Sequence, residues 1–240
     1  MAQARAVQTY DVGDPMPPEY RDLVVHLILN EHLEVIGNPE YVALLDRFWD
    51  AAMKLDTSEQ EKVRIVSYIM QETGHGYIFW KMLRDLGVEV KQAVPIKHYV
   101  FHMPYETLAD FGFFTFLADR VGKYQFENME GCSYLPLARI AGTIVKHEVG
   151  HYTLGHEILE RLLHDGQRAH LQDRLEVWYP AALDMFGRSE STRQWQYIAH
   201  GIKRWPNEEL RQRFIREVNP ILAGEFGFAL PDEKANRRFL

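Results

Sequence analysis

The chain has 240 residues, which is long enough for one large domain or two small ones. Hydrophobic residues make up 46% of it and aromatic residues 12%, so a sizeable apolar core can form. The net charge is −7 with both signs interspersed, which argues against nucleic acid as a partner.

Cysteine content and apolar runs bear on the compartment. Cys132 is the single cysteine of the sequence, so no disulfide can form within the chain, which fits a reducing environment. Residues 1–10 lack the apolar run of a signal peptide, and no apolar run approaches the roughly 20 residues that span a membrane. We therefore expect a soluble, cytoplasmic protein that does not enter a membrane.

The first third of the chain predicts an extended arm followed by helices. Residues 1–20 contain three prolines and are expected to be extended. Apolar residues at helical spacing predict helices over 19–36, ended by Gly37-Asn38-Pro39, and over 41–55. A long helix then runs to Leu86 and stops at Gly87, and its start carries the capping-box residues Thr57 and Ser58 with Gln60 and Glu61.

The remainder also predicts helices and no convincing strand. Residues 88–105 contain two prolines and are expected to form a crossover. A helix follows over about 105–129, and Pro136 suits the first turn of another that continues to Gly166. Shorter helices are expected over 168–186, 190–204 and 207–223. Long neighbouring helices of this kind, without a clear linker, predict an all-α bundle in a single domain over 1–240.

A repeated motif carries the chemistry. Glu72-Thr73-Gly74-His75 and Glu148-Val149-Gly150-His151 both have the form E-x-x-H within long predicted helices. Residues three apart share a helix face, so each motif directs one carboxylate and one imidazole to the same side. A single motif is usually a surface pair, but apolar and aromatic neighbours flank both copies here. The pair is typical of a di-iron or di-manganese site in a helical bundle.

Such a site needs one more carboxylate from each of the two other helices. The first helix offers Glu31 and Glu34, and spacing alone does not choose between them. The helix over 105–129 offers Asp119, Glu127 and Glu130. Asp119 is the preferred ligand because it lies among aromatic residues, where a carboxylate is costly to bury unless it is paired or metal-bound.

The second motif also has the zinc-peptidase form H-E-x-x-H. In that interpretation His147 and His151 bind zinc and Glu148 is the general base. His156 does not have the spacing of a third ligand, although Glu176 could serve. The zinc interpretation leaves the first motif and Asp119 without a role, so the two-metal interpretation is preferred.

The sequence resembles the phenylacetic acid catabolic family of ferritin-like di-iron proteins, and within it the catalytic subunits of phenylacetyl-CoA epoxidase. The resemblance extends from Pro17 to Asp232 and includes both E-x-x-H motifs. Its most specific segments are 178–181, 185–187 and 202–214. It implies a ferritin-like four-helix bundle with additional C-terminal helices. The metal ligands that it implies are Glu34, Glu72, His75, Asp119, Glu148 and His151.

The same resemblance implies an activity, cofactors and partners. Two iron ions, or manganese ions, bridged by Glu72 and Glu148 would activate O2 and epoxidise the aromatic ring of phenylacetyl-CoA. Electrons would come from outside the chain, because one cysteine cannot hold an iron–sulfur cluster, and the resemblance implies an NADPH-dependent reductase as their source. A non-catalytic ferritin-like subunit would be a second partner. The alternatives are a related di-metal oxidase acting on another acyl-CoA and a non-catalytic scaffold subunit.

Some residues depart from the family pattern or remain open in role. Gln71 and His147 stand where acidic residues precede the motif glutamates in the family, and such residues often orient the histidine of the opposite helix. Tyr68 replaces a lysine and could donate a hydrogen bond or an electron, or simply pack in the core. Cationic residues near the C-terminus could bind CoA phosphates, or could equally form a solvated helix face: Lys203, Arg204 and Arg211, with Arg213 and Arg216.

Overall fold

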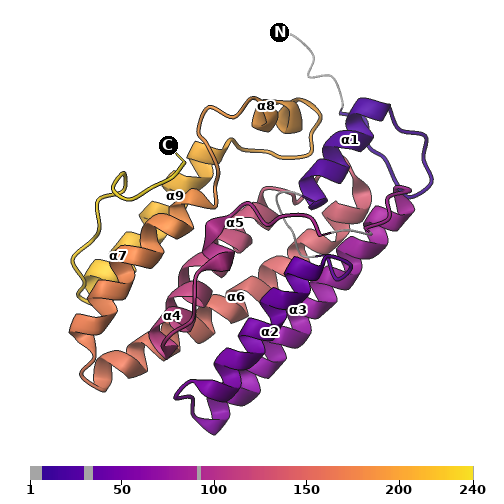
Figure 1. Ribbon diagram of the computed structural model, residues 1–240. Coiled ribbons are helices and arrows are strands. Elements are labelled where there is room, and N and C mark those ends of the chain that lie inside the picture. The colour runs from indigo at the N-terminus through magenta and orange to yellow at the C-terminus, as the bar shows by residue number, and fades with distance from the viewer. Residues whose placement is uncertain (1–6, 30–34, 91–92, 240) are drawn as a thin grey trace.

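Helices build the molecule, as the computed structural model shows for residues 7–29, 35–90 and 93–239 (Figure 1). Within those ranges the chain forms no strand, and its one isolated β-bridge joins Tyr10 to Tyr134. None of the described helices is long and apolar enough to cross a bilayer. The prediction of an all-α, ferritin-like bundle is confirmed.

Four helical columns pack side by side and form the bundle. The first two are α2 (Pro39–Lys54) and α3 (Glu59–Asp85), which pack on each other. The third column is continuous through α4 (Leu108–Phe113), the π-helix η3 (Phe114–Asp119) and α5 (Arg120–Glu127). The fourth is α6 (Leu135–His164), which contacts both α3 and the third column and so lies at the centre.

Local sequence signals set the ends of the two longest helices. Ser58 begins α3 with a capping box, in which its hydroxyl accepts from the amide of Glu61 and the Glu61 carboxylate accepts from the amide of Ser58. Thr57 does not cap the helix, since its hydroxyl donates to the carbonyl of Ala52. Gly87 follows the end of α3 at a φ of 71°, where a side chain would be strained.

The helix predicted over 19–36 is confirmed in its first part and passes into residues outside the described ranges. The structure gives α1 over Pro18–Leu27, and Asn38 then caps α2 by accepting from the amide of Glu40. Residues 30–34, which include Glu31 and Glu34, lie outside the described residues. The predicted ligand Glu34 therefore stays a prediction.

The third column departs from the single α-helix that the sequence predicts. Thr107 and Asp110 form the capping box of α4, and the helix widens into the π form from Phe114 to Asp119. The hydroxyl of Thr115 donates to the carbonyl of Phe111 inside this column. Single π turns within α-helices occur frequently at functional sites, and this one ends at a predicted metal ligand.

The C-terminal third covers one side of the bundle. Its helices are α7 (Arg168–Asp184), α8 (Thr192–Ala199) and α9 (Asn207–Pro220), followed by the π-helix η4 (Ile221–Glu225). The helix predicted over 190–204 is shorter because Gly201 takes a φ of 67°. In Figure 1 the remaining chain, in yellow, runs back beside α7 to the C-terminus.

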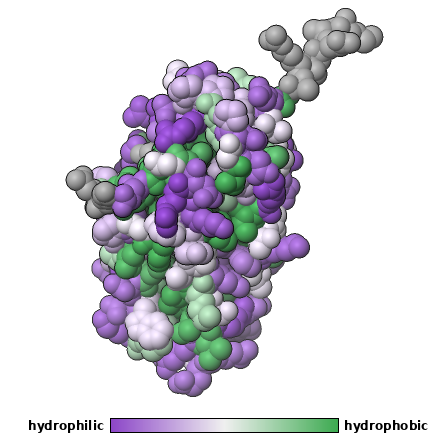
Figure 2. All heavy atoms as spheres, turned by 90° about the vertical axis from the view of Figure 1, so that its right-hand side faces the viewer, coloured by the Kyte–Doolittle hydropathy of each residue, from purple (hydrophilic) through white to green (hydrophobic). Residues whose placement is uncertain are grey.

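The outer face of the bundle carries apolar side chains among polar ones. On α3 the exposed residues Val63, Met70 and Tyr77 follow one another at intervals of seven. Figure 2 views the side of the molecule on which α3 lies and shows apolar groups interspersed with hydrophilic ones. Positions seven apart lie on one side of a helix, so these residues form a stripe along the outside of α3.

Candidate metal centre

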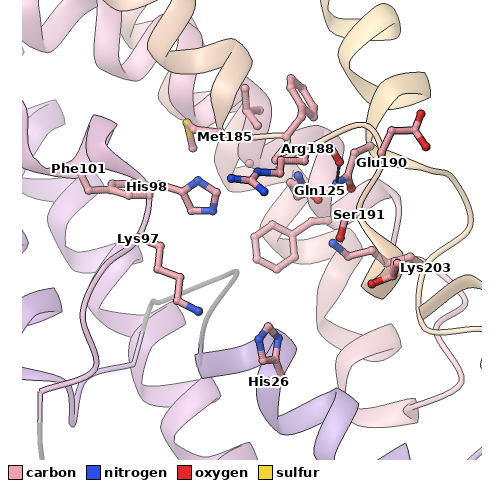
Figure 3. Close-up of a pocket in the computed structure, with 17 residues that line it drawn as sticks. His26, Lys97, His98, Phe101, Gln125, Met185, Arg188, Glu190, Ser191 and Lys203 are labelled. Carbon is pink, nitrogen blue, oxygen red and sulfur yellow. Dashed lines mark hydrogen bonds between the residues drawn. The ribbon is translucent and has the colours of Figure 1, made fainter. Parts of the chain in front are cut away.

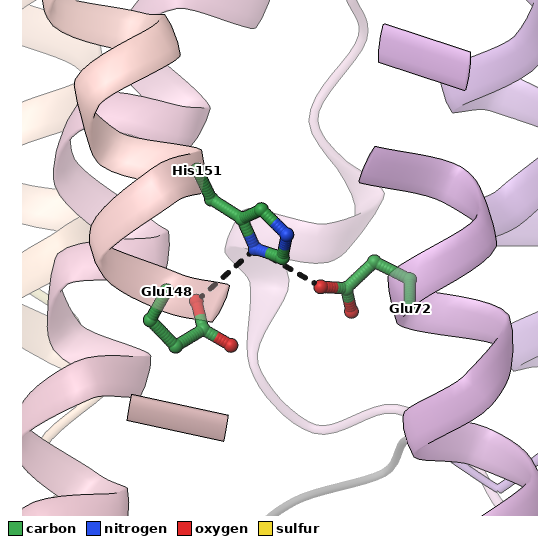
Figure 4. A group of neighbouring side chains, drawn as sticks. All are labelled: Glu72, Glu148 and His151. Atoms are coloured by element: carbon green, nitrogen blue, oxygen red, sulfur yellow. Dashed lines mark ion pairs between the residues drawn. The ribbon is translucent and has the colours of Figure 1, made fainter. Parts of the chain in front are cut away.

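The two E-x-x-H motifs face each other from neighbouring helices. Glu72 and His75 lie on α3, while Glu148 and His151 lie on α6, and all four side chains are buried. Figure 4 shows the imidazole of His151 between the two carboxylates. Its Nδ1 is 3.2 Å from an oxygen of Glu72 and 3.5 Å from an oxygen of Glu148. One ligand atom from each of these three residues lies within 4.8 Å of the others.

The other predicted ligands lie around this group as far as the structure describes them. His75 places its Nδ1 3.7 Å from an oxygen of Glu72. Asp119, the last residue of η3, is buried, and its charge influences the same tyrosine, Tyr68, as the charges of the two glutamates. Burial raises the pKa of Tyr68 well above its ordinary value, and the charges of Asp119, Glu72 and Glu148 add to that effect.

Crossed hydrogen bonds orient both histidines. The Nε2 of His151 bonds to the Oε1 of Gln71 at 2.8 Å, and the Nε2 of His75 bonds to the Nδ1 of His147 at 2.9 Å. Each histidine is thus held by the residue that precedes the glutamate of the opposite motif. With Nε2 engaged in this way, each ring turns its Nδ1 toward the motif carboxylates, and metal-ligating histidines are commonly held through their other nitrogen.

This arrangement does not favour the zinc-peptidase interpretation. His147 directs its Nδ1 at His75 and stacks on that ring, with centroids 5.2 Å apart, instead of joining His151 at one ion. Glu176, the third ligand considered for zinc, is exposed on α7 and contacts Gln172. The geometry brings the two motifs together as halves of one site.

The donor set fits divalent metal ions. The Nδ1 of His151 is buried and has no hydrogen-bond partner among the described residues, although two carboxylates face it. Burial lowers the pKa of His151 to about 4, so the imidazole is neutral at pH 7 and cannot itself neutralise those carboxylates. A cation bound between them would do so, and imidazole with carboxylate ligands suits iron or manganese.

Two further residues shape the site, and spacing alone pointed to neither role. The ring of Tyr68 lies edge-on to His151 with centroids 4.3 Å apart. A β-carbon built on Gly122 would lie 3.2 Å from the carboxylate of Glu148, so glycine is what lets that carboxylate approach α5. A glycine three residues after the predicted ligand Asp119, on the same helix face, is the signal that could have identified it.

A buried ion pair supports the column that carries Asp119. Arg120 is 3% exposed, lies against the rings of Phe116 and Tyr152, and contacts Glu217 of α9 at 2.7 Å. Glu217 also accepts from the hydroxyl of Tyr124. The pair therefore fixes α5 to α9 beside the site, because breaking it would leave a buried guanidinium without its partner.

Stability at this ion pair should depend on pH. Burial opposes ionisation of Glu217, but the hydrogen bond from Tyr124 and the charges of Lys123 and Arg120 outweigh burial and lower its pKa below 4.5. A carboxyl group whose pKa is lowered by folding stabilises the fold at pH values above its unfolded-state pKa. This stabilisation is lost as the pH falls through the folded-state pKa. We expect Glu217→Gln to reduce the unfolding free energy by about 2 kcal/mol at pH 7 and by progressively less below pH 4.5.

Urea unfolding across this pH range measures the effect. Glu209→Gln, on the same helix and paired with Arg213 at the surface, is the control and should change stability little at any pH. A Glu217→Gln deficit that is the same at pH 3.5 and pH 7 would contradict the assignment.

A pocket of about 450 Å³ opens beside the centre (Figure 3). Gly122 forms part of its wall, which brings the pocket next to Glu148. Its apolar lining comes from Phe101, Val121, Phe126, Met185 and Phe186. Among the described residues, its cationic and imidazole groups are Lys97, Arg188, Lys203, His26 and His98, and its carboxylate comes from Glu190.

The three cations that the sequence suggested for binding CoA have different surroundings in the structure. Lys203 lines the pocket. Arg204 does not line it and donates to the carbonyl of Glu127 and to Glu130 at the surface. Arg211 is 2% exposed and donates to backbone carbonyls, so it holds a turn in place and does not face a ligand. Lys97 and Arg188 were missed because they lie in a crossover and a turn that show no periodic pattern.

Comparison with known proteins identifies the family of the chain. Residues 58–238 match the family model described as phenylacetic acid catabolic protein. The chain belongs to this family. It is also 27% identical over 245 aligned positions to a 1,2-phenylacetyl-CoA epoxidase subunit of Escherichia coli (strain K12), covering 97% of this chain and 75% of that protein. The predicted family is thereby confirmed, and the family match includes both E-x-x-H motifs and Asp119.

Proposed function

We propose that the chain is the catalytic subunit of a multicomponent di-iron monooxygenase that epoxidises the aromatic ring of phenylacetyl-CoA. The observation that carries the proposal is the buried group of Glu72, Glu148 and His151 beside a pocket with an apolar lining and several cations. The similarity to an epoxidase subunit supports an oxygenase of this class.

The proposed site uses the predicted ligands together. Glu72, His75, Asp119, Glu148 and His151, with Glu34, would hold two iron ions, and manganese would accept the same donors. The bound metals would supply the activation of O2. Gln71 and His147 would keep both imidazoles oriented, and Tyr68 with its aromatic neighbours would exclude water from the ligands.

The pocket suits a substrate with an apolar end and an anionic end. Phe101, Phe126 and Phe186 would pack against an aromatic ring next to the metals. Lys97, Arg188 and Lys203 would attract the phosphates of CoA, since charge-assisted bonds to phosphate are strong. Binding of the large CoA group would hold the ring in place for reaction.

The proposal includes partners. Cys132 is the single cysteine and cannot hold an iron–sulfur cluster, so the electrons would come from outside the chain. The family resemblance makes an NADPH-dependent reductase their proposed source. A non-catalytic ferritin-like subunit would complete the assembly, since the relative is named as one subunit of an epoxidase. A second candidate is a di-metal oxygenase for another acyl-CoA, which the replacements Tyr68, Gln71 and His147 beside the metal ligands favour.

Metal uptake and product analysis test the proposal. Metal-free protein mixed anaerobically with ferrous iron should bind about two ions per chain. With reductase, partner subunit, NADPH and phenylacetyl-CoA, it should transfer one atom of labelled O2 into the thioester, detected by mass spectrometry. Failure to bind iron would overturn the catalytic role. Iron binding with oxygenation of a different acyl-CoA would favour the second candidate.

A further inference from the structure

We infer that the C-terminal segment, residues 232–239, supports the substrate pocket from outside by holding two of its walls together. We call Asp184, Tyr99, Arg237, Arg238 and Phe239 the C-terminal clamp. The clamp sets how firmly the walls are held and therefore how tightly the pocket binds its ligand. This inference rests on the proposed function for the identity of the ligand.

The two walls in question come from distant parts of the chain. Residues 97–101 belong to the crossover and the short helix η2 (Tyr99–His102), and they contribute Lys97, His98 and Phe101. Residues 185–192 follow α7 and contribute Met185 and Arg188. Figure 3 shows Lys97 and His98 on one side of the pocket and Arg188 and Glu190 on another. Neither wall lies within a long helix, so other contacts must fix their separation.

Asp184 connects these walls directly. It is the last residue of α7, is 1% exposed, and immediately precedes the second wall. Its carboxylate accepts from the hydroxyl of Tyr99 in the first wall, at 3.2 Å. Burial first, and then the charge of Asp184, raise the pKa of Tyr99 to about 12, so the hydroxyl keeps its proton at neutral pH.

The C-terminal segment closes the clamp around the same carboxylate. Arg237 donates its Nε at 3.0 Å, and the backbone amides of Arg238 and Phe239 donate at 2.6 and 3.2 Å. The guanidinium of Arg238 lies 3.8 Å from the centre of the Tyr99 ring. The segment therefore touches both Asp184 and Tyr99, and three parts of the chain meet at one buried carboxylate.

Arg211 supports the second wall from the opposite side. Its guanidinium donates to the carbonyls of Leu183 and Gly187 and to the hydroxyl of Ser189. Its charge is close enough to Asp184 and Arg237 for both to influence its own ionisation. Loss of Arg237 would still leave Arg211 near Asp184, so an Arg237 variant should fold.

The segment itself depends on these bonds for its position. Residues 232–239 are mostly exposed or half-buried and bring few apolar side chains to the core. Segments with few buried apolar contacts open locally at low free-energy cost. Removing the bonds at Asp184 should therefore release the segment, uncover Tyr99 and loosen both pocket walls while the metal site stays intact.

Three variants test the clamp. Arg237→Ala removes the side-chain bond from the clamp to Asp184, and a chain ending at Pro231 removes the whole segment. Lys234→Ala is the matched control, since Lys234 is an exposed cation of the same segment. We expect the Kd for phenylacetyl-CoA, measured by calorimetry, to rise about tenfold in the first two and to stay unchanged in the control. KM should rise with kcat nearly unchanged, and ferrous iron uptake should match that of the original chain.

A second measurement does not depend on the ligand. Amide hydrogen exchange over 97–103 and 185–191 should accelerate in Arg237→Ala and not in Lys234→Ala. Unchanged exchange in Arg237→Ala would overturn the clamp even if the original chain fails to bind phenylacetyl-CoA. That failure of binding would instead count against the proposed substrate. Should the shortened chain not fold, Arg237→Ala and Tyr99→Phe still decide the question.

Discussion

Glu72→Ala is expected to abolish both iron binding at the centre and oxygenation, while leaving the helix content unchanged. The carboxylate of Glu72 is the one that approaches both His75 and His151, so its loss removes a donor shared across the site. A loss of about 4 kcal/mol in transition-state stabilisation corresponds to roughly a thousandfold in rate, and we expect at least that reduction. The backbone should persist because Tyr41 bonds to the carbonyl of residue 72, which the substitution keeps.

The same variant should have an unfolding free energy that hardly changes when iron is added. Without metal, removing one of several buried carboxylates relieves repulsion, so the metal-free variant should be at least as stable as the original chain. With ferrous iron at a hundred times its Kd, the original chain should gain about 2.7 kcal/mol and the variant almost nothing. Thermal unfolding with and without iron measures this difference.

A matched surface change separates the effect from general loss of charge. Glu160→Ala removes an exposed carboxylate from α6 and should preserve iron uptake, turnover and the stabilisation by iron. Full iron content and turnover in Glu72→Ala would show that the centre lies elsewhere.

Gly155→Ala should be the most destabilising single methyl addition in the bundle core. A β-carbon on Gly155 would lie 2.4 Å from the amide nitrogen of Phe116 and 2.7 Å from the carbonyl oxygen of Gly112. Both are backbone atoms, so α6 and the third column would have to move apart. Overpacking of this kind costs about 3 kcal/mol, which exceeds the roughly 1 kcal/mol that alanine gains over glycine in a helix.

Gly150→Ala provides the control on the same helix. Nothing lies within 4 Å of a β-carbon built there, so this change should raise the unfolding free energy by about 1 kcal/mol. Urea unfolding of both variants should therefore separate them by several kcal/mol. Because Phe116 belongs to the π-helix that ends at Asp119, Gly155→Ala should also weaken iron binding. Equal stability of the two variants would contradict the close packing.

Periodic features of the sequence predicted most of the fold. The capping box at Ser58, the glycine stop at Gly87 and the two E-x-x-H motifs are local patterns, and the structure places them in α3 and α6 as expected. The π turn before Asp119 was not predictable in this way. Its wider backbone is packed against Gly155 from a helix distant in sequence, and no propensity scale contains that contact.

The pocket shows where sequence reasoning stops. Arg211 and Lys203 are both cations near the C-terminus, yet one supports a turn and the other lines the cavity. Lys97 reaches the same cavity from a crossover more than a hundred residues away from Lys203 in the sequence. Only the packing of the helices decides which cations converge, so residue type alone could not assign them. The ligand Glu34 stays a prediction from the resemblance.

The crossed hydrogen bonds at the centre also tie the site to assembly of the bundle. Gln71 holds His151 and His147 holds His75, so neither helix orients its own histidine. A slip of one residue between α3 and α6 would turn Gln71 and His147 about 100° away from their partners and shift them by about 1.5 Å, breaking both bonds at once. Any metal held by the two motifs would therefore depend on the docked helix pair, because either helix alone carries one carboxylate and one imidazole, and that imidazole lacks the residue that orients it.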